Sequence, residues 1–182
     1  MENKKTKIII ISGKARTGKD VIIDCLKKQY KEKIIVLKYS FYIKEYAKNI
    51  SDWDGSEETK PRELLQQLGT DIIRTKIDDK FFINRMIEDI KVYSFFFDYI
   101  LIGDARFIEE IEDIKNIFDD IITVRITRPN FDNGLTEKQK NHPTEVGLDN
   151  YELFEYKIIN DGRLEDLKLK IERLIEVINN ES

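Results

Sequence analysis

Hydrophobic and polar positions along the chain follow two periods, one typical of buried strands and the other of amphipathic helices. Short apolar runs predict strands at about residues 7–12, 34–38, 99–104, 121–127 and 156–159. Between them, apolar residues recur every three or four positions, which predicts helices up to about 30, from 41, from 61, and at 79–95, 108–118 and 164–178. Strands that alternate with helices favour a three-layer α/β/α fold around a mostly parallel sheet of about five strands.

The first predicted strand runs directly into a glycine-rich loop. This loop contains Gly13, Lys14, Ala15, Arg16, Thr17, Gly18, Lys19 and Asp20. Glycines let backbone N–H groups curl around polyphosphate oxygens, the lysine adds a positive charge, and the following helix points its positive end at the same anion. We therefore interpret residues 13–20 as a P-loop that binds a nucleoside triphosphate. A surface loop with incidental glycines is the alternative, and the strand–loop–helix setting argues against it.

One position of this loop departs from the usual motif. Asp20 follows the lysine, where Ser or Thr ordinarily supplies a magnesium ligand. A carboxylate there would repel phosphate unless a metal lay between them, and Mg²⁺ accepts carboxylate oxygens directly or through water. Asp20 is therefore a candidate magnesium ligand. An ordinary acidic residue in the first turn of a helix is the alternative.

Composition and charge narrow the class of protein. The 182 residues suffice for one core, so we expect a single domain over 1–182. Charged residues make up 36% but nearly cancel to a net −4, which gives no support for a nucleic-acid partner. One cysteine allows no internal disulfide. The apolar runs, including the one behind Lys4 and Lys5, are too short for a secretion signal or a membrane span. We expect a cytoplasmic monomer or homodimer that acts on small molecules.

Several polar residues lie at or just after the ends of predicted strands. They are Ser40, Asp104, Arg106, Arg128, Asn160, Asp161 and Gly162. Ligands of open α/β sheets bind beyond the carboxyl ends of the strands, so these residues are expected beside the P-loop. Asp104 is interpreted as a catalytic carboxylate that orients magnesium, with a helix N-cap as the alternative. Arg106 is interpreted as a bidentate ligand of a phosphoryl group, with a salt bridge to a local glutamate as the alternative.

The helix predicted from residue 61 carries a polar ridge opposite its apolar stripe. The residues of the ridge recur at helical spacing and are Arg62, Gln66, Thr70 and Arg74. Such a ridge can face an acceptor phosphate, or it can be a solvated surface. Lys44, in the preceding helix, has the same two interpretations.

The longest polar segment, at about 129–149, has almost no apolar periodicity. Such a segment is typical of a functional lid, which is the interpretation we predict, or of a disordered stretch, which is the alternative. Phosphoryl transfer needs a lid because water would otherwise intercept the transferring group. The segment contains Lys138, Lys140, His142 and Glu145. His142 precedes a proline, which favours a local hydrogen bond over an acid–base role. Further on, residues 160–162 can cap the last helix through Asp161 or lie against a nucleobase, and both interpretations can hold.

These blocks together resemble the phage-type deoxynucleoside monophosphate kinases, a branch of the P-loop nucleoside monophosphate kinase fold. The resemblance covers most of the chain and is carried by residues 12–20, 62–71, 104–106, 128–129, 142–148 and 158–162. A P-loop that ends Gly-Lys-Asp is a feature of that branch. The animal-type phosphomevalonate kinases share this feature and also resemble residues 145–150. The chain departs from the family at Phe41-Tyr42, where a Gly-Pro pair is common before the position of Lys44, and in a shorter acceptor region.

The resemblance implies magnesium-dependent transfer of the γ-phosphoryl group from ATP to a monophosphate acceptor. Its implied catalytic residues are Lys19, Asp104 and Arg106, with Asp20 and Asp104 as metal ligands. ATP would be bound by residues 13–20, Arg128, Asn160 and Gly162. The acceptor would bind at the helical region of about 41–95, and its candidate ligands are Ser40, Lys44, Arg62, Gln66, Arg74 and Glu145.

Two alternatives to a deoxynucleotide kinase remain open. The first is a kinase for another small phosphorylated acceptor, of the phosphomevalonate or dephospho-coenzyme A type. The second is an ATP-binding regulatory protein that does not catalyse transfer. Asp104, Arg106 and the predicted lid favour a transferase, because a protein that only binds ATP needs neither a lid nor acceptor arginines.

Overall fold

A computed structural model describes residues 6–180; Lys4 and Lys5 of the basic start lie outside the described residues. Its helices and strands follow one another along the chain as β1 (Lys7–Ser12), α1 (Lys19–Tyr30), the 3₁₀-helix η1 (Lys31–Lys33), β2 (Ile34–Leu37), α2 (Tyr39–Ile50), α3 (Arg62–Gln66), the π-helix η2 (Gln67–Ile77), α4 (Phe81–Tyr93), β3 (Tyr99–Ala105), α5 (Glu109–Lys115), β4 (Ile121–Thr127), α6 (Glu137–Lys140), α7 (Pro143–Val146), β5 (Tyr156–Ile159) and α8 (Leu164–Asn180). All five predicted strands are present. Across residues 6–180, no helix has the length and apolar character needed to cross a bilayer.

The five strands form one sheet in the order β2-β3-β1-β4-β5, and every neighbouring pair is parallel. This confirms the predicted α/β fold with a parallel sheet. Since β1 is central, the segments that follow β3 and β4 leave the sheet on either side of the segment that follows β1. The carboxyl edge at the centre of such a sheet is where ligands bind.

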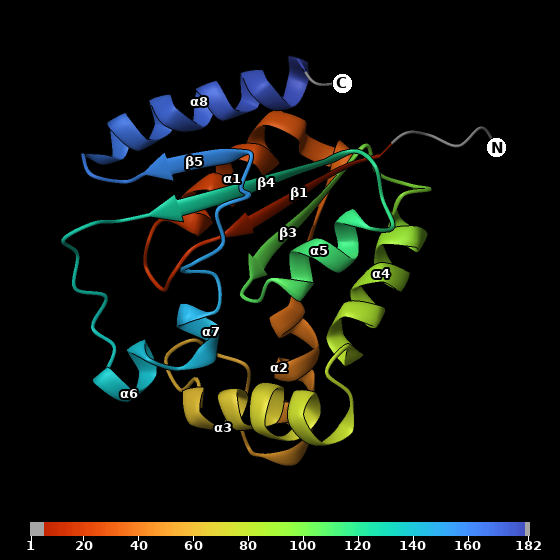
Figure 1. Cartoon of the computed structure of the whole chain (residues 1–182), viewed down its shortest axis with the longest axis vertical. Coiled ribbons are helices and arrows are strands. Elements are labelled where there is room, and N and C mark those ends of the chain that lie inside the picture. The colour runs from red at the N-terminus through yellow and green to blue at the C-terminus, as the bar shows by residue number, and fades with distance from the viewer. Residues whose placement is uncertain (1–5, 181–182) are drawn as a thin grey trace.

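The isoleucines of β1 show why both faces of the sheet are covered. Ile8 and Ile10 belong to one buried cluster, and Ile9 and Ile11 belong to the other. Helices α4 and α5 cover the first face, and α1 and α8 cover the second (Figure 1). A strand that is buried on both faces reads as a continuous apolar run, as this one does.

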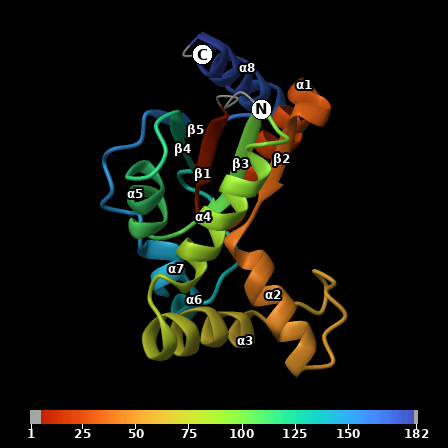
Figure 2. The same cartoon turned by 90° about the vertical axis from the view of Figure 1, so that its right-hand side faces the viewer.

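The helices α2, α3 and η2 extend beyond the carboxyl edge of the sheet (Figure 2). A third, smaller cluster holds them together, formed by buried Ala47, Trp53 and Leu68. Trp53 belongs to the mostly polar segment at 51–61, between α2 and α3. Its ring is buried, and its indole N–H donates to the carbonyl of Ser56 at 3.0 Å. This loop therefore contributes a buried ring to the cluster that it shares with α2, α3 and η2.

Two helical segments differ from the sequence prediction. Helix α2 begins at Tyr39 rather than near 41. The helix predicted from 61 continues as a π-helix after Gln66, and this rare form occurs often at functional sites. Within it, Gly69 faces Ile43 so closely that a Cβ atom would lie 2.8 Å from the Ile43 Cδ1. The glycine thus allows η2 to approach α2.

Candidate active site

The loop between β1 and α1 has the tight geometry that its glycines predict. Gly18 has a φ of 108°, a conformation that favours glycine. A Cβ on Gly13 would lie 2.7 Å from the backbone oxygen of Ile126, so no larger residue fits beside β4. Arg16 has a φ of 60°, and its guanidinium reaches the lid segment at Gly134. The predicted strand–loop–helix setting of the P-loop is present.

Lys19 lies at the centre of the predicted catalytic residues. Its ammonium donates to the backbone oxygens of Gly13 and Lys14, the second at 2.8 Å. Burial, together with the smaller effect of the positive charge of Arg106, lowers the pKa of Lys19 to about 7. The carboxylates of Glu145, Asp20 and Asp104 oppose this shift. The structure therefore brings four charged groups predicted for the site within electrostatic reach of the lysine.

Asp104 caps a helix, but not the one that follows it. Its carboxylate oxygens accept the backbone N–H groups of Tyr39 at 2.8 Å and Ser40 at 3.0 Å, so it caps the start of α2. Helix α5, which was the expected recipient of an N-cap, begins only at Glu109. Asp104 therefore caps a helix, as the N-cap alternative predicts, but the capped helix is α2 and not α5. This tertiary cap also explains why α2 begins at Tyr39.

Arg106 is paired with Glu145 of α7. The guanidinium donates to the Glu145 carboxylate at 2.9 Å and to the backbone oxygen of Thr144 at 3.2 Å. The other oxygen of Glu145 accepts the P-loop N–H of Ala15 at 3.1 Å. Gly147 permits this contact, because a Cβ there would lie 2.7 Å from the Arg106 carbonyl oxygen. A carboxylate from the lid is therefore bound jointly by a P-loop amide and by the arginine.

A second carboxylate from the same segment holds two further cations. Asp149 pairs with Lys14 at 2.7 Å and with Arg125 at 3.2 Å. Arg125 also donates to the hydroxyl of Ser12 at 2.8 Å, and that hydroxyl donates to the backbone oxygen of Ala105 at 2.9 Å. Neither Arg125 nor Asp149 was predicted as a site residue. One signal was present for Arg125, which is the only charged residue of strand β4.

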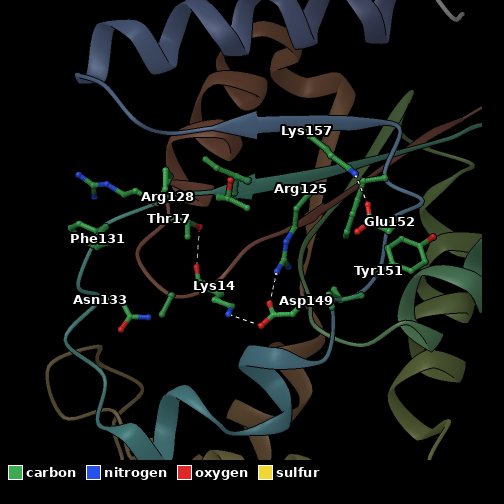
Figure 3. A pocket seen from close by; sticks show the side chains of 16 residues that line it. Lys14, Thr17, Arg125, Arg128, Phe131, Asn133, Asp149, Tyr151, Glu152 and Lys157 are labelled. Carbon is green, nitrogen blue, oxygen red and sulfur yellow. Dashed lines mark hydrogen bonds and ion pairs between the residues drawn. The ribbon is translucent and has the colours of Figure 1, made fainter.

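An open pocket of about 410 Å³ lies beside this network (Figure 3). It extends from Lys14 and Thr17 of the P-loop along β4 and β5, with Arg125 pointing into it and Arg128 at one end (Figure 3). Register places Arg125 opposite Lys157 on the neighbouring strand. Aromatic rings of the lid segment and the chain that follows it complete the wall, namely Phe131, Tyr151 and Phe154. Cationic and aromatic groups thus line the same pocket.

The candidates for the nucleoside side of an ATP site are held by local contacts. The Arg128 guanidinium lies 3.7 Å from the centroid of the Phe131 ring. Asn160 is buried, and its amide donates to the backbone oxygen of Thr17 at 2.9 Å, so it braces the P-loop. Asp161 pairs with Lys170 and is not the cap of α8, which begins at Leu164. Gly162 packs against Asp166 of the same helix.

The predicted acceptor residues do not form one cluster. Lys44 pairs with Glu57 of the loop before α3, and Arg62 is exposed. Gln66 is half-buried, and Ser40 donates its backbone N–H to Asp104. Arg74 is turned inward and pairs with buried Glu110. Glu145, predicted with this group, instead contacts the P-loop.

The lid segment contains two short helices. Thr136 caps α6 through a capping box with Gln139. His142 caps α7, and its Nδ1 lies 2.9 Å from the hydroxyl of Thr144. The local hydrogen bond predicted for the histidine is therefore present.

Comparison with known proteins identifies the family. A family model described as deoxynucleotide monophosphate kinase matches residues 37–171. The chain belongs to the deoxynucleotide monophosphate kinase family. The predicted resemblance is confirmed at this level, and the chain is a phosphotransferase. The matched span begins after the P-loop, so the interpretation of residues 13–20 depends on the motif and on the β1–α1 geometry.

Solved structures show the same fold as this kinase at low sequence identity. TT1252 from Thermus thermophilus is 15% identical, with a TM-score of 0.57 over 95% of this chain and 98% of that chain. Shikimate kinase from Bacteroides thetaiotaomicron is 14% identical, with a TM-score of 0.55 over 95% and 98%. Dephospho-CoA kinase from Campylobacter jejuni is 12% identical, with a TM-score of 0.54 over 94% and 96%. No curated protein sequence matches this kinase. These structures support the fold alone.

The residues near Lys19 fit a magnesium ion that is shared with a bound nucleotide. Within residues 6–180, no group of three or more His, Cys, Asp or Glu side chains is arranged to hold a metal by itself. Mg²⁺ in kinases needs no such group, since one or two carboxylates hold it together with substrate phosphates. Asp20 is exposed in the first turn of α1, and the two oxygens of Asp104 accept one backbone N–H each, from Tyr39 and Ser40. Both carboxylates can thus contribute oxygen ligands.

Proposed function

We propose that this kinase transfers the γ-phosphoryl group of ATP to a deoxynucleoside monophosphate in a magnesium-dependent reaction. The observation that carries the proposal is the anion site at the P-loop. There, the Ala15 N–H and the Arg106 guanidinium together hold the Glu145 carboxylate, and Lys19 lies close by. Amide, guanidinium and ammonium groups that converge from two strand ends are the donors that phosphoryl transfer requires. Membership of the family supports the monophosphate acceptor.

Each part of the site has a role in the proposed reaction. The P-loop amides and Lys19 bind the phosphates of ATP, and Arg106 neutralises the charge that spreads over the transferring group. Asp20 and Asp104 would hold Mg²⁺, which supplies charge neutralisation between the phosphates. The lid at 129–149 keeps water from the transferring group. Arg128, Asn160 and Gly162 position the nucleoside of ATP.

The proposed acceptor region is the helical part at about 41–95. It has a small cluster of its own around Trp53 and Leu68, and it also packs against the main core through Tyr39 and Ile73. Lys44, Arg62 and Gln66 are the proposed ligands of the acceptor, with Ser40 at the junction of α2 and Asp104. The acceptor phosphate is expected between these helices and Arg106.

An assay of ADP release tests this function directly. The full-length protein is mixed with Mg-ATP and, in separate reactions, with each of the four deoxynucleoside monophosphates, with AMP and with phosphomevalonate. A deoxynucleoside monophosphate is expected to stimulate ADP release well above the rate with ATP alone. Stimulation by phosphomevalonate only would assign another acceptor, and no stimulation by any of them would refute transfer to this acceptor class.

We expect Glu145→Gln to strengthen the binding of Mg-ATP by roughly three- to tenfold. The Glu145 carboxylate contacts the Ala15 amide and Arg106, which are the groups proposed to bind phosphate, so ATP would have to displace it. The ion pair between Glu145 and Arg106 is partly buried and contributes about 1 kcal/mol, so its removal lowers the free energy needed to displace residue 145. The substitution also removes the repulsion between the carboxylate and the phosphates. Isothermal titration with a non-hydrolysable ATP analogue measures the effect.

The matched control for this prediction is Glu137→Gln, because Glu137 is an exposed carboxylate of the same lid segment. Its affinity for the analogue is expected to stay within twofold of the wild type. Weaker binding by the Glu145 variant would contradict the prediction and show that the carboxylate assists the nucleotide or its metal.

A further inference from the structure

One buried carboxylate has no part in the proposed chemistry. Glu110 lies in the first turn of α5, and only 1% of its surface is exposed. Burying a carboxylate is costly unless hydrogen bonds and a cation compensate it. Its neighbour Glu109 is exposed and has no such requirement. The contacts of Glu110 therefore indicate which interactions require a carboxylate at this buried position.

Glu110 first fixes the chain that carries Arg106. One carboxylate oxygen accepts the backbone N–H of Arg106 at 2.6 Å and that of Phe107 at 3.2 Å. These two amides lie between the end of β3 and the start of α5, outside both elements. The carboxylate thus holds the backbone from which the Arg106 guanidinium extends toward the P-loop.

Glu110 also holds the acceptor-side helices. Its other oxygen forms an ion pair with Arg74 of η2. The Arg74 guanidinium stacks 4.3 Å from the centroid of the Phe107 ring and donates to the backbone oxygen of Asp79 at 3.4 Å. In addition, the hydroxyl of Tyr39, at the start of α2, donates to the Glu110 carbonyl oxygen at 3.0 Å. One residue therefore connects α2, η2 and the Arg106 loop.

A purely stabilising role explains this arrangement poorly. Well-packed apolar residues usually stabilise a core as well as a buried ion pair does. They cannot accept hydrogen bonds from two successive amides while also fixing a cation on another helix. Burial raises the pKa of Glu110 to about 7, against the opposing effect of the Arg74 charge. Placing a carboxylate at this buried position therefore has a free-energy cost.

We propose that Glu110 is a positioning residue that fixes Arg106 relative to the acceptor-side helices through Arg74. The inference rests on the proposed function, in which Arg106 meets the transferring group and the helices hold the acceptor. It also assigns Arg74 a different role from the predicted one. With its guanidinium held by Glu110 and stacked on Phe107, Arg74 acts through the buried carboxylate and does not bind the acceptor phosphate directly.

The first test compares Glu110→Gln with Glu109→Gln in the full-length protein. Glutamine offers one oxygen and so cannot serve both the amides and Arg74. We expect kcat for the deoxynucleotide acceptor to fall by about 10- to 100-fold and its KM to rise several-fold, since supporting residues of a site have effects of this size. The affinity for ATP is expected to stay within twofold. Equal kinetics of the two variants would overturn the proposal.

The double variant Arg74→Met/Glu110→Gln separates positioning from stability. It leaves no unpaired buried charge, so its melting temperature is expected to return toward that of the wild type. The connection to η2 is still absent, and kcat is expected to remain at least tenfold below wild type. Recovery of kcat together with the melting temperature would mean that Glu110 acts through stability alone and would overturn the proposal.

Amide hydrogen exchange measured by NMR tests the connection without any acceptor. The Arg106 and Phe107 amides are expected to exchange at least tenfold faster in Arg74→Met/Glu110→Leu, which removes the acceptor of both hydrogen bonds, than in Glu109→Gln. Unchanged exchange at both amides would overturn the inference, even in an active enzyme. If no acceptor stimulates ADP release by the wild type, the proposed function fails, and faster exchange would still show that Glu110 holds this loop.

Discussion

Lys19→Met is expected to reduce phosphoryl transfer by roughly 10³-fold while the fold is retained. The lysine is the cation at the centre of the site, within reach of Arg106, Asp20, Asp104 and Glu145. A preorganised charge that meets developing negative charge in a low-dielectric site contributes several kcal/mol to catalysis, and methionine keeps the shape without the charge. Steady-state rates of ADP release with the best acceptor measure the effect.

The same residue gives the site a characteristic pH dependence. The pKa of Lys19 is lowered to about 7, mainly by burial, so the amine is largely neutral at pH 8. Bound phosphates favour the charged form, and ATP binding at pH 8 should therefore take up close to one proton. The apparent affinity for ATP should fall with rising pH above about 7, by at most tenfold per unit. Titration calorimetry in two buffers with different ionisation enthalpies measures the uptake.

Lys28→Met is the control for both measurements, because Lys28 is an exposed residue of the same helix α1. It should show wild-type turnover and wild-type proton uptake. Substantial turnover by the Lys19 variant, or proton uptake that persists in it, would contradict the assignment of the P-loop lysine.

Arg74→Met is expected to destabilise the protein by about 3 kcal/mol at pH 8, because it leaves the Glu110 carboxylate buried without its cation. The loss should shrink as the pH falls toward 5. The pKa of Glu110 is already raised from 4.5 to about 7 by burial, and losing Arg74 raises it further. A carboxyl whose pKa is higher in the folded state than in the unfolded state lowers stability as pH rises above the unfolded value of 4.5. Below that value the group is neutral in both states.

Urea unfolding at pH 5.5 and pH 8 measures this pH dependence. The matched control is Arg62→Met, an exposed arginine at the start of α3 in the same helical segment, which should change stability by no more than about 0.5 kcal/mol. Equal destabilisation of the Arg74 variant at the two pH values would contradict an uncompensated carboxylate at Glu110.

The partners of Arg106 and Asp104 could not be predicted from the sequence. Arg106 had two interpretations, a phosphoryl ligand and a salt bridge to a local glutamate. Its glutamate is Glu145, which lies 39 residues further along the chain. Asp104 likewise caps a helix that begins 65 residues before it. Spacing along the chain carries no signal for contacts at this separation, because they depend on which strands become neighbours in the sheet.

Local pattern was enough for the strands, the P-loop and most helices, since two-sided burial requires a run such as Ile8–Ile11 and phosphate binding requires Gly13, Gly18 and Lys19. The sequence by itself thus determined the α/β fold and the family resemblance. Only the tertiary structure decided that Glu145 reaches the P-loop amide of Ala15 and Asp149 the P-loop lysine Lys14. It also decided that Glu110, but not Glu109, is buried against Arg74. The two glutamates are identical in type and adjacent in sequence. The two differ in burial because packing of the whole chain orients α5 so that Glu110 faces Arg74 of η2 and Glu109 is exposed.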